Sequence, residues 1–366
     1  MTCATCHAEV INTESLGFCC GRGSNSQPQV LEMPTVPDDL MELYIESLEL
    51  QLHSRKYNNA FSMSAIGTTG SFEIFKAPCN SILTGKTYHR MLPGNDKSGP
   101  LRWFLNDSDY SSLQIEQFSL DSELIDSLKT TLLRCNPLFQ QFKLLADEPS
   151  EEARLEITIS DNREIAAIII PNRNGEMKNR AIVCWKTTEQ QATFIEVTSP
   201  LFLPLHYVMI CPQGTPGWSL YLQIGGRKIS MLMFYRQMVL RCSTLHLFGS
   251  FFNEFCVDIF SAIEENRLNW IKFNQSKILR KEDLNDPHEL GRVFLPASFI
   301  GSYRHNQKMV ADALAIVSRL KNPTYFITFT CNPNWSEIQE RLRPRQNYSD
   351  RPDVVNMVFK AKLQKF

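Results

Sequence analysis

The spacing of apolar residues changes near residue 228, and this change constrains the fold more than any other feature of the sequence. Between residues 154 and 224, short β-prone runs alternate with Asn, Gly and Pro, which is the pattern of strands joined by turns. Further along the chain, apolar residues recur at helical spacing, most clearly at Phe252, Phe255, Cys256, Ile259, Phe260 and Ile263. The sequence therefore predicts a strand-rich region followed by a helical one.

These two patterns predict a multi-domain α+β protein with an antiparallel-sheet N-terminal region. The predicted strands span residues 155–159, 165–170, 181–185, 194–197 and 220–224. Helices are predicted at residues 37–53, 122–135 and 306–320. We divide the 366 residues into three parts: a cysteine-rich head (1–30), an α+β region (35–225) and a mainly helical segment with one strand near its end (228–366).

Four of the 11 cysteines lie within the first 20 residues, at Cys3, Cys6, Cys19 and Cys20. Four thiolates are the ligand number of a structural zinc site, and an odd cysteine total argues against a disulfide framework. The second pair is adjacent, unlike a Cys-x2-Cys knuckle, and His7 could replace one sulfur. We predict structural zinc on these four cysteines. The alternative is a frayed terminus with free thiols.

The last 66 residues, 301–366, form a basic segment. They carry 11 Lys and Arg against 5 Asp and Glu, a net charge of +6, whereas the whole chain has a formal net charge of −1. A predicted strand at 326–330 leads to polar Thr330 and Asn332, where functional groups often lie. Arg341, Arg343 and Arg345 follow Trp335, and such a set could grip phosphates and stack a base of single-stranded DNA. A core strand and a solvated helix end are the alternatives.

Other features exclude several classes of protein. No apolar run approaches the ~18 to 20 residues that cross a bilayer, and no secretory signal is visible, so we expect a soluble, intracellular protein without a membrane partner. Thr84-Gly85-Lys86-Thr87 lacks the earlier glycine of a phosphate-binding loop, since Asn80 stands there. The seven histidines are spread singly, so their local spacing builds no catalytic metal site.

Several strings, in order along nearly the whole chain, resemble the Helitron-like transposase family in its N-terminal and helicase-like region. They are Phe18-Cys-Cys-Gly21, Lys56-Tyr-Asn-Asn-Ala-Phe61, Pro204-Leu-His-Tyr207, Ile263-Glu-Glu-Asn-Arg-Leu268, Leu295-Pro-Ala-Ser-Phe-Ile-Gly301, Phe326-Ile-Thr-Phe-Thr-Cys-Asn-Pro-Asn-Trp335 and Asp350-Arg-Pro-Asp353.

The resemblance implies a rolling-circle transposase. In that family a Rep-type endonuclease holds a divalent metal with a His-hydrophobic-His pair and attacks DNA with a tyrosine, and a separate helicase uses ATP. By resemblance, residues 326–330 are the first strand of a Rep-like domain. The 366 residues contain no His-hydrophobic-His pair, and the resemblance supplies neither the nucleophilic tyrosine motif nor a Walker loop.

From this departure we expect a catalytically inactive transposase fragment, truncated before that pair and nuclear if expressed. Two alternatives stay open. The chain is a retained single-stranded DNA-binding or assembly module without catalysis, or it is an incomplete gene model of an active DNA nicking and joining transposase. The sequence leaves the oligomeric state unknown.

Overall fold

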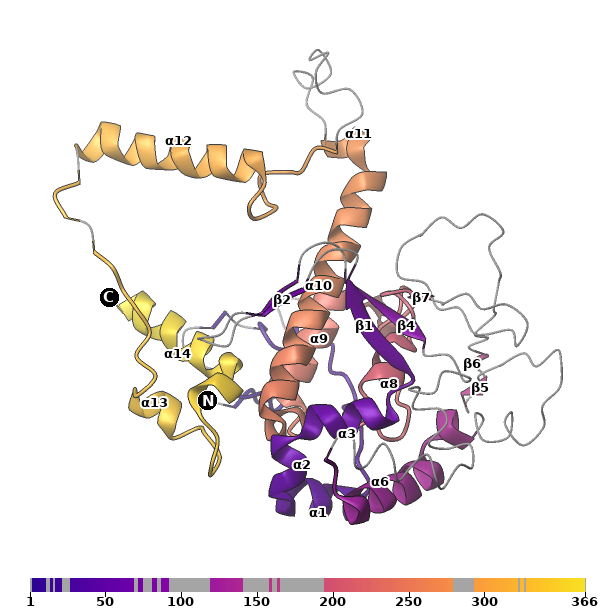
Figure 1. Ribbon diagram of the computed structural model, residues 1–366. Coiled ribbons are helices and arrows are strands. Elements are labelled where there is room, and N and C mark those ends of the chain that lie inside the picture. The colour runs from indigo at the N-terminus through magenta and orange to yellow at the C-terminus, as the bar shows by residue number, and fades with distance from the viewer. Residues whose placement is uncertain are drawn as a thin grey trace. The chain divides into compact units, whose positions relative to one another are not determined.

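The computed structural model shows a mainly helical chain (Figure 1). It describes residues 2–10, 14–15, 17–21, 27–68, 72–74, 81–83, 87–91, 119–140, 158–159, 163–164, 194–278, 293–321, 323–325 and 327–365. The chain divides into two compact units, one formed by residues 1–259 with 333–366 and one by residues 260–332, and each is described by itself. The predicted domain boundaries stay predictions.

Helices account for most of the regular structure. The α-helices are α1 (Asp38–Glu46), α2 (Leu48–Leu52), α3 (Ser54–Phe61), α6 (Ser122–Cys135), α8 (Phe202–His206), α9 (Met231–Arg241), α10 (Gly249–Phe273), α11 (Gln275–Ile278), α12 (Tyr303–Leu320), α13 (Ser336–Gln339) and α14 (Pro352–Lys365). Among the described residues, the short 3₁₀ helices η1 (Leu245–Leu247) and η3 (Tyr348–Asp350) precede α10 and α14.

The described strands are only two to five residues long. They are β1 (Ser64–Thr68), β2 (Phe72–Ile74), β3 (Ser81–Leu83), β4 (Thr87–Met91), β5 (Thr158–Ile159), β6 (Arg163–Glu164), β7 (Phe194–Ile195), β8 (Gln223–Ile224) and β9 (Arg227–Lys228). β4 pairs antiparallel with β1 and β7, and the others form two-stranded pairs: β2 with β3, β5 with β6, and β8 with β9.

The predicted α+β class with an antiparallel-sheet region is therefore wrong, because long helices and not strands dominate the described chain. The predicted strands at 165–170 and 181–185 lie outside the described residues. At 194–197 and 220–224 only the two-residue strands β7 and β8 form, and between them residues 201–211 are buried one after another in α8 and tight turns. Pro204 lies within this run and Pro200 and Pro212 flank it, and proline cannot donate to a strand ladder.

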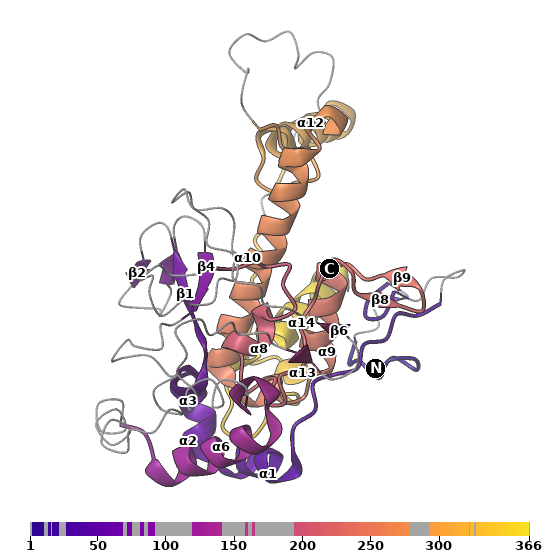
Figure 2. The same cartoon turned by 90° about the vertical axis from the view of Figure 1, so that its right-hand side faces the viewer.

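The core of the first unit forms around the start of α10, which lies among α8, α9 and α14 (Figures 1 and 2). The stripe predicted from helical spacing is buried at Phe252, Phe255 and Ile259. Tyr207 packs edge-on against Phe255 at 5.0 Å between ring centroids, and its hydroxyl donates to Asp258 Oδ2 at 2.9 Å. Burying a hydroxyl and a carboxylate here is offset by their mutual hydrogen bond.

The segment before α14 is anchored to η1 and to the first turn of α10. The side chain of Gln346 donates to the carbonyl of His246 at 2.6 Å, and Asn253 donates to the carbonyl of Ser349 at 2.7 Å. A Cβ at Gly249 would lie 2.5 Å from Asp350 Oδ1, so this close approach requires glycine. These contacts fix the entry of α14.

Arg351 and Asp353 form a buried ion pair at the start of α14. Arg351 donates twice to the carboxylate, from Nε at 3.0 Å and from Nη2 at 2.9 Å. Their side chains are 7% and 6% exposed, and the geometry is bidentate, as a buried arginine pair needs. The string Asp350-Arg-Pro-Asp353 therefore has a structural role in this fold.

The second unit contains α12 and the residues after it. Ser302 caps α12 by accepting from the backbone N–H of His305 at 3.0 Å, yet no residue of α12 is buried. The strand predicted at 326–330 is wrong, because the described residues 327–330 are irregular and Ile327 is 66% exposed. A strand needs a hydrogen-bonded neighbour, and no described strand pairs with these residues.

Candidate metal centre and nucleic-acid interface

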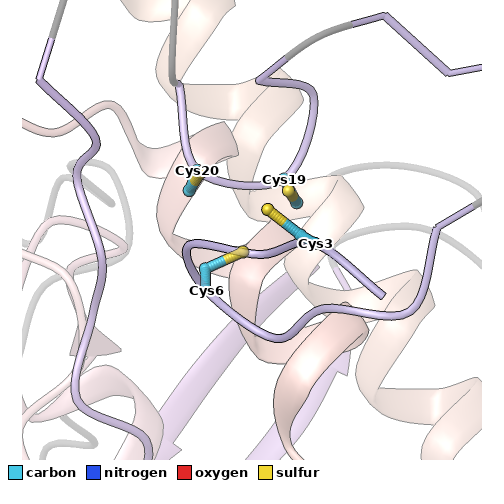
Figure 3. A group of neighbouring side chains, drawn as sticks. All are labelled: Cys3, Cys6, Cys19 and Cys20. Carbon is cyan, nitrogen blue, oxygen red and sulfur yellow. The ribbon is translucent and has the colours of Figure 1, made fainter. Parts of the chain in front are cut away.

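The four N-terminal cysteines converge on one point. Their sulfur atoms all lie within 4.8 Å of one another, and among the described residues this is the one such cluster of metal-ligating side chains. Figure 3 shows Cys3 and Cys6 on one loop and Cys19 and Cys20 on a second loop facing it. Cys6, Cys19 and Cys20 are buried and Cys3 is half-buried, which does not fit a frayed terminus.

Local backbone turns present these thiols. In the first loop, the N–H of Cys3 donates to the carbonyl of Ala8 and the N–H of His7 donates to the carbonyl of Cys3, both at 2.9 Å. His7 has φ 59°, which turns the chain sharply after Cys6. In the second loop, the N–H of Gly21 donates to the carbonyl of Gly17 at 2.7 Å. His7 is exposed and lies outside the cluster, so the cluster contains four sulfurs without His7.

The electrostatics of the cluster suit a cation. Burial raises the pKa of Cys3, but the backbone N–H groups of Cys6 and Thr5 and the thiols of Cys19 and Cys6 outweigh it and lower that pKa to about 6. Burial raises the pKa of Cys19 well above its usual value, and the adjacent Cys6 and Cys3 raise it further. A bound cation removes this conflict because it replaces the thiol protons.

The donor set fits a structural metal. Tetrahedral zinc holds each sulfur at ~2.3 Å, which places sulfurs about 3.8 Å apart, so a small inward movement of the four side chains completes the geometry. The cluster can therefore hold a structural metal such as zinc.

The predicted DNA-binding residues fall into both units. Thr330 and Asn332 are exposed and belong to residues 260–332, whereas Trp335, Arg341, Arg343 and Arg345 belong to the first unit. Trp335 is half-buried, and Lys362 Nζ lies 5.2 Å from its ring centroid. Arg343 and Arg345 are exposed. Gln346 accepts from the N–H of Arg343 at 3.1 Å and so fixes the loop that carries both arginines.

The basic side chains near the C-terminus divide into paired and unpaired sets. Arg351 pairs with Asp353, Lys360 with Glu14 at 3.0 Å, and Lys362 with Glu337 at 2.6 Å. The pKa of Glu337 is lowered, mainly because its carboxylate accepts a hydrogen bond from the Lys362 ammonium. For Arg341, Arg343 and Arg345, which stand close together in the sequence, no described carboxylate lies within ion-pair distance. These three arginines remain available for an external anion.

Sequence reasoning missed the residues that connect the cysteine cluster to the rest of the first unit. Leu240 of α9 and Met357 of α14 pack against the cluster, and Arg236 and Lys360 lie over the ring of Phe18. Phe18 directly precedes Cys19 in the sequence, and this position beside a candidate metal ligand was the only local indication that Phe18 matters. Its partners are more than 200 residues away, so no spacing rule could find them.

A basic segment is the electrostatic footprint of many proteins that bind nucleic acid. Residues 229–366 match the family model described as "Helitron helicase-like domain at N-terminus". The predicted resemblance is therefore confirmed for residues 229–366, and this chain contains a Helitron helicase-like domain of the kind found in transposases. No curated protein and no solved structure matches it.

A domain of this family implies an interaction with DNA. In the part of the chain that the structure describes, no helix combines the length and apolar character needed to cross a membrane.

Proposed function

We propose that this chain binds single-stranded DNA in Helitron-type transposition, through Arg341, Arg343 and Arg345, with Trp335, Thr330 and Asn332 as further contacts. The observation that supports it is that Arg341, Arg343 and Arg345 stand within five positions of one another in the family domain and that none of them pairs with a described carboxylate. Three other basic residues form ion pairs with carboxylates of the same chain: Arg351, Lys360 and Lys362. No described carboxylate forms an ion pair with Arg341, Arg343 or Arg345. Phosphate contacts need such available charge.

The proposal gives Trp335 a smaller role than the arginines. Its ring is half-buried and already faces the ammonium of Lys362, so a base could stack there only after that lysine moves. The proposal also assigns binding, not cleavage, to these residues. Cleavage of the Rep type uses a metal held by paired histidines, and the 366 residues contain no His-hydrophobic-His pair.

The test is a salt titration of binding to a mixed-sequence single-stranded oligonucleotide, read by fluorescence anisotropy. Each phosphate neutralised on a single strand contributes about −0.7 to the slope of log K against log salt. Replacing Arg341, Arg343 and Arg345 by Ala should therefore lower the magnitude of that slope by about 2 and weaken binding at low salt.

A matched control removes three positive charges elsewhere in the same basic segment, as Lys308→Ala, Arg319→Ala and Lys321→Ala, which are all exposed. This control should retain most of the affinity and slope. Equal losses in both triple variants would contradict the proposed site and indicate binding by net charge alone. Circular dichroism of each variant checks that the helices are intact.

For the head, the proposal is that one zinc ion binds Cys3, Cys6, Cys19 and Cys20 and holds a segment too short to fold on its own core. Elemental analysis should find one zinc per chain, and Cys19→Ala with Cys20→Ala should abolish it. The control is Cys135→Ala with Cys331→Ala, which replaces two half-buried cysteines outside the cluster. Zinc retained in the first variant, or well under one zinc in the unaltered chain, contradicts the site.

A further inference from the structure

The cysteine head, meaning the described residues among 2–21, packs directly against two helices of the Helitron helicase-like domain. Cys6, Cys19 and Cys20 form one buried cluster with Leu240 of α9, and Met357 of α14 packs against that cluster. Residues more than 200 and more than 330 positions away in the sequence thus complete the apolar surroundings of the thiols. All of these residues belong to the same compact unit.

Phe18 joins the two helices at this surface. The guanidinium carbon of Arg236, on α9, lies 4.4 Å from its ring centroid, and Lys360 Nζ, on α14, lies 5.6 Å from it. Arg236 also donates from Nη1 to the carbonyl of Phe18 at 3.0 Å. Two cations over one aromatic ring give attractive contacts that depend on the ring staying in place. Phe18 directly precedes Cys19, so the position of the thiol loop sets the position of the ring.

An ion pair closes the same surface. Lys360 Nζ contacts both carboxylate oxygens of Glu14, at 3.1 and 3.0 Å. The Glu14 side chain is only 5% exposed, so the carboxylate is largely removed from water and depends on its partner. Glu14 lies between the two cysteine pairs in the sequence, and its position therefore also depends on the thiol loops.

We propose that the metal-loaded head is a clasp that holds α14 against α9, and that loading with metal thereby orders the basic segment. This inference rests on the proposed zinc site and deepens the proposed DNA-binding function by naming its regulation. A head with so few buried residues needs the metal to keep its loops folded. Without the metal, Phe18 and Glu14 lose their fixed positions, and α14 loses the partners of Met357 and Lys360.

The clasp also extends to the proposed DNA-binding segment. Lys362 follows Lys360 on α14 and pairs with Glu337 of α13 while lying over Trp335. Movement of α14 therefore disturbs α13, from which the chain continues to Arg341, Arg343 and Arg345. Metal at the N-terminus and DNA affinity near the C-terminus are connected through α14.

The test is amide hydrogen exchange of the full chain, first with zinc bound and then after a chelator removes it. The clasp predicts that α14 amides exchange about tenfold faster or more in the zinc-free chain. The amides of α6, whose described long-range side-chain hydrogen bonds go to Asp39 and to the carbonyl of Pro212 and not to the head, should change little. Zinc content is measured on each sample.

Two variants that keep all four cysteines separate the clasp from the metal site. Phe18→Ala and Lys360→Gln should each retain one zinc per chain, yet speed α14 exchange with zinc bound. Lys365→Gln removes the same charge from the exposed end of the same helix and should leave exchange unchanged.

Each outcome decides the proposal. Zinc bound with α14 exchange unaffected by chelation overturns the clasp and leaves the metal site standing. Equal acceleration in α6 and α14 overturns it as well, because the metal would then support the whole unit. Absence of bound zinc overturns both the metal site and the clasp.

Discussion

Helices α12 and α14 both carry several apolar side chains but bury very different amounts of them. In α14, Val354 and Val358 are 1% and 3% exposed, and Lys360 and Lys362 both reach carboxylates of other elements. In α12 no residue is buried, and Val310 and Leu314 are 59% and 61% exposed. Amphipathic spacing thus specifies a helix and its apolar face but does not specify what covers that face.

This difference shows that α14 is stabilised by contacts with other elements of the chain. Helices shorter than about 15 residues are marginal alone, so a 14-residue helix such as α14 depends on tertiary contacts. Its contacts come from the head, from α13 and from the surroundings of His246. At the start of α12, the described contacts include the Ser302 cap and the contacts of Arg304, which donates to the carbonyl of Ile278 at 3.3 Å and lies over the ring of Phe294. Matched substitutions in the two helices should therefore give unequal effects.

The largest difference is expected for the aspartates of the two helices. Asp353→Ala leaves Arg351 buried without its carboxylate, which should lower the free energy of unfolding by about 3 to 5 kcal/mol. Asp312→Ala on α12 removes an exposed carboxylate and should change it by no more than about 0.5 kcal/mol. Urea denaturation followed by tryptophan fluorescence measures both. Similar losses in the two variants would break the comparison.

Apolar truncation should give the next largest difference. Val358→Ala removes two buried methyl groups from α14 and should lower the free energy of unfolding by about 2 kcal/mol. Leu314→Ala removes more atoms from α12, but that side chain is 61% exposed, so a change within about 0.5 kcal/mol is expected. The same denaturation measurement applies. A larger loss at Leu314 would show that its apolar face is covered in solution.

Local signals predicted the elements that local physics controls. The helix predicted at 122–135 is α6, Ser122–Cys135. The side chain of Asp121 accepts from the N–H groups of Glu123 and Leu124, and the helix stops before Asn136-Pro137. Four cysteines close in sequence likewise predicted the cluster that the structure shows.

Structural features that depend on residues far away in the sequence could not be predicted. The apolar run at 326–330 reads as a strand, yet a strand exists only where another strand pairs with it. By its spacing, Phe260 continues the apolar stripe of α10, but its side chain is 63% exposed. The spacing of apolar residues does not show which of them other elements will cover. The contacts of the Phe18 ring with Arg236 and Lys360 join residues more than 200 positions apart in the sequence.

The smallest expected effect concerns pH at the base of α14. Burial lowers the pKa of His246, the charge of Arg351 and that of Arg343 lower it further, and Asp353 and the carbonyl of Val239 oppose them. The Asp353 carboxylate lies 3.9 Å from His246 Nε2, and the Val239 carbonyl lies 2.8 Å from it. The folded chain therefore holds His246 neutral at pH values where the unfolded chain has begun to bind a proton.

The sign of the effect follows from this order of pKa values. Because the folded pKa lies below the unfolded value of about 6.5, the neutral ring contributes its full stability above pH 6.5. That contribution falls as the pH drops from about 6.5 through the folded pKa, at up to about 1.4 kcal/mol for each pH unit. The free energy of unfolding should therefore decrease more steeply between pH 7 and pH 5 than it does in a His246→Gln variant.

The matched control is His305→Gln, which makes the same replacement in the first turn of α12. We expect the curve of unfolding free energy against pH for that variant to follow the curve of the unaltered chain. Equal flattening by both replacements would mean that the pH response does not belong to the contacts around α14. A curve for His246→Gln that coincides with that of the unaltered chain would remove His246 from the account of how α14 is held.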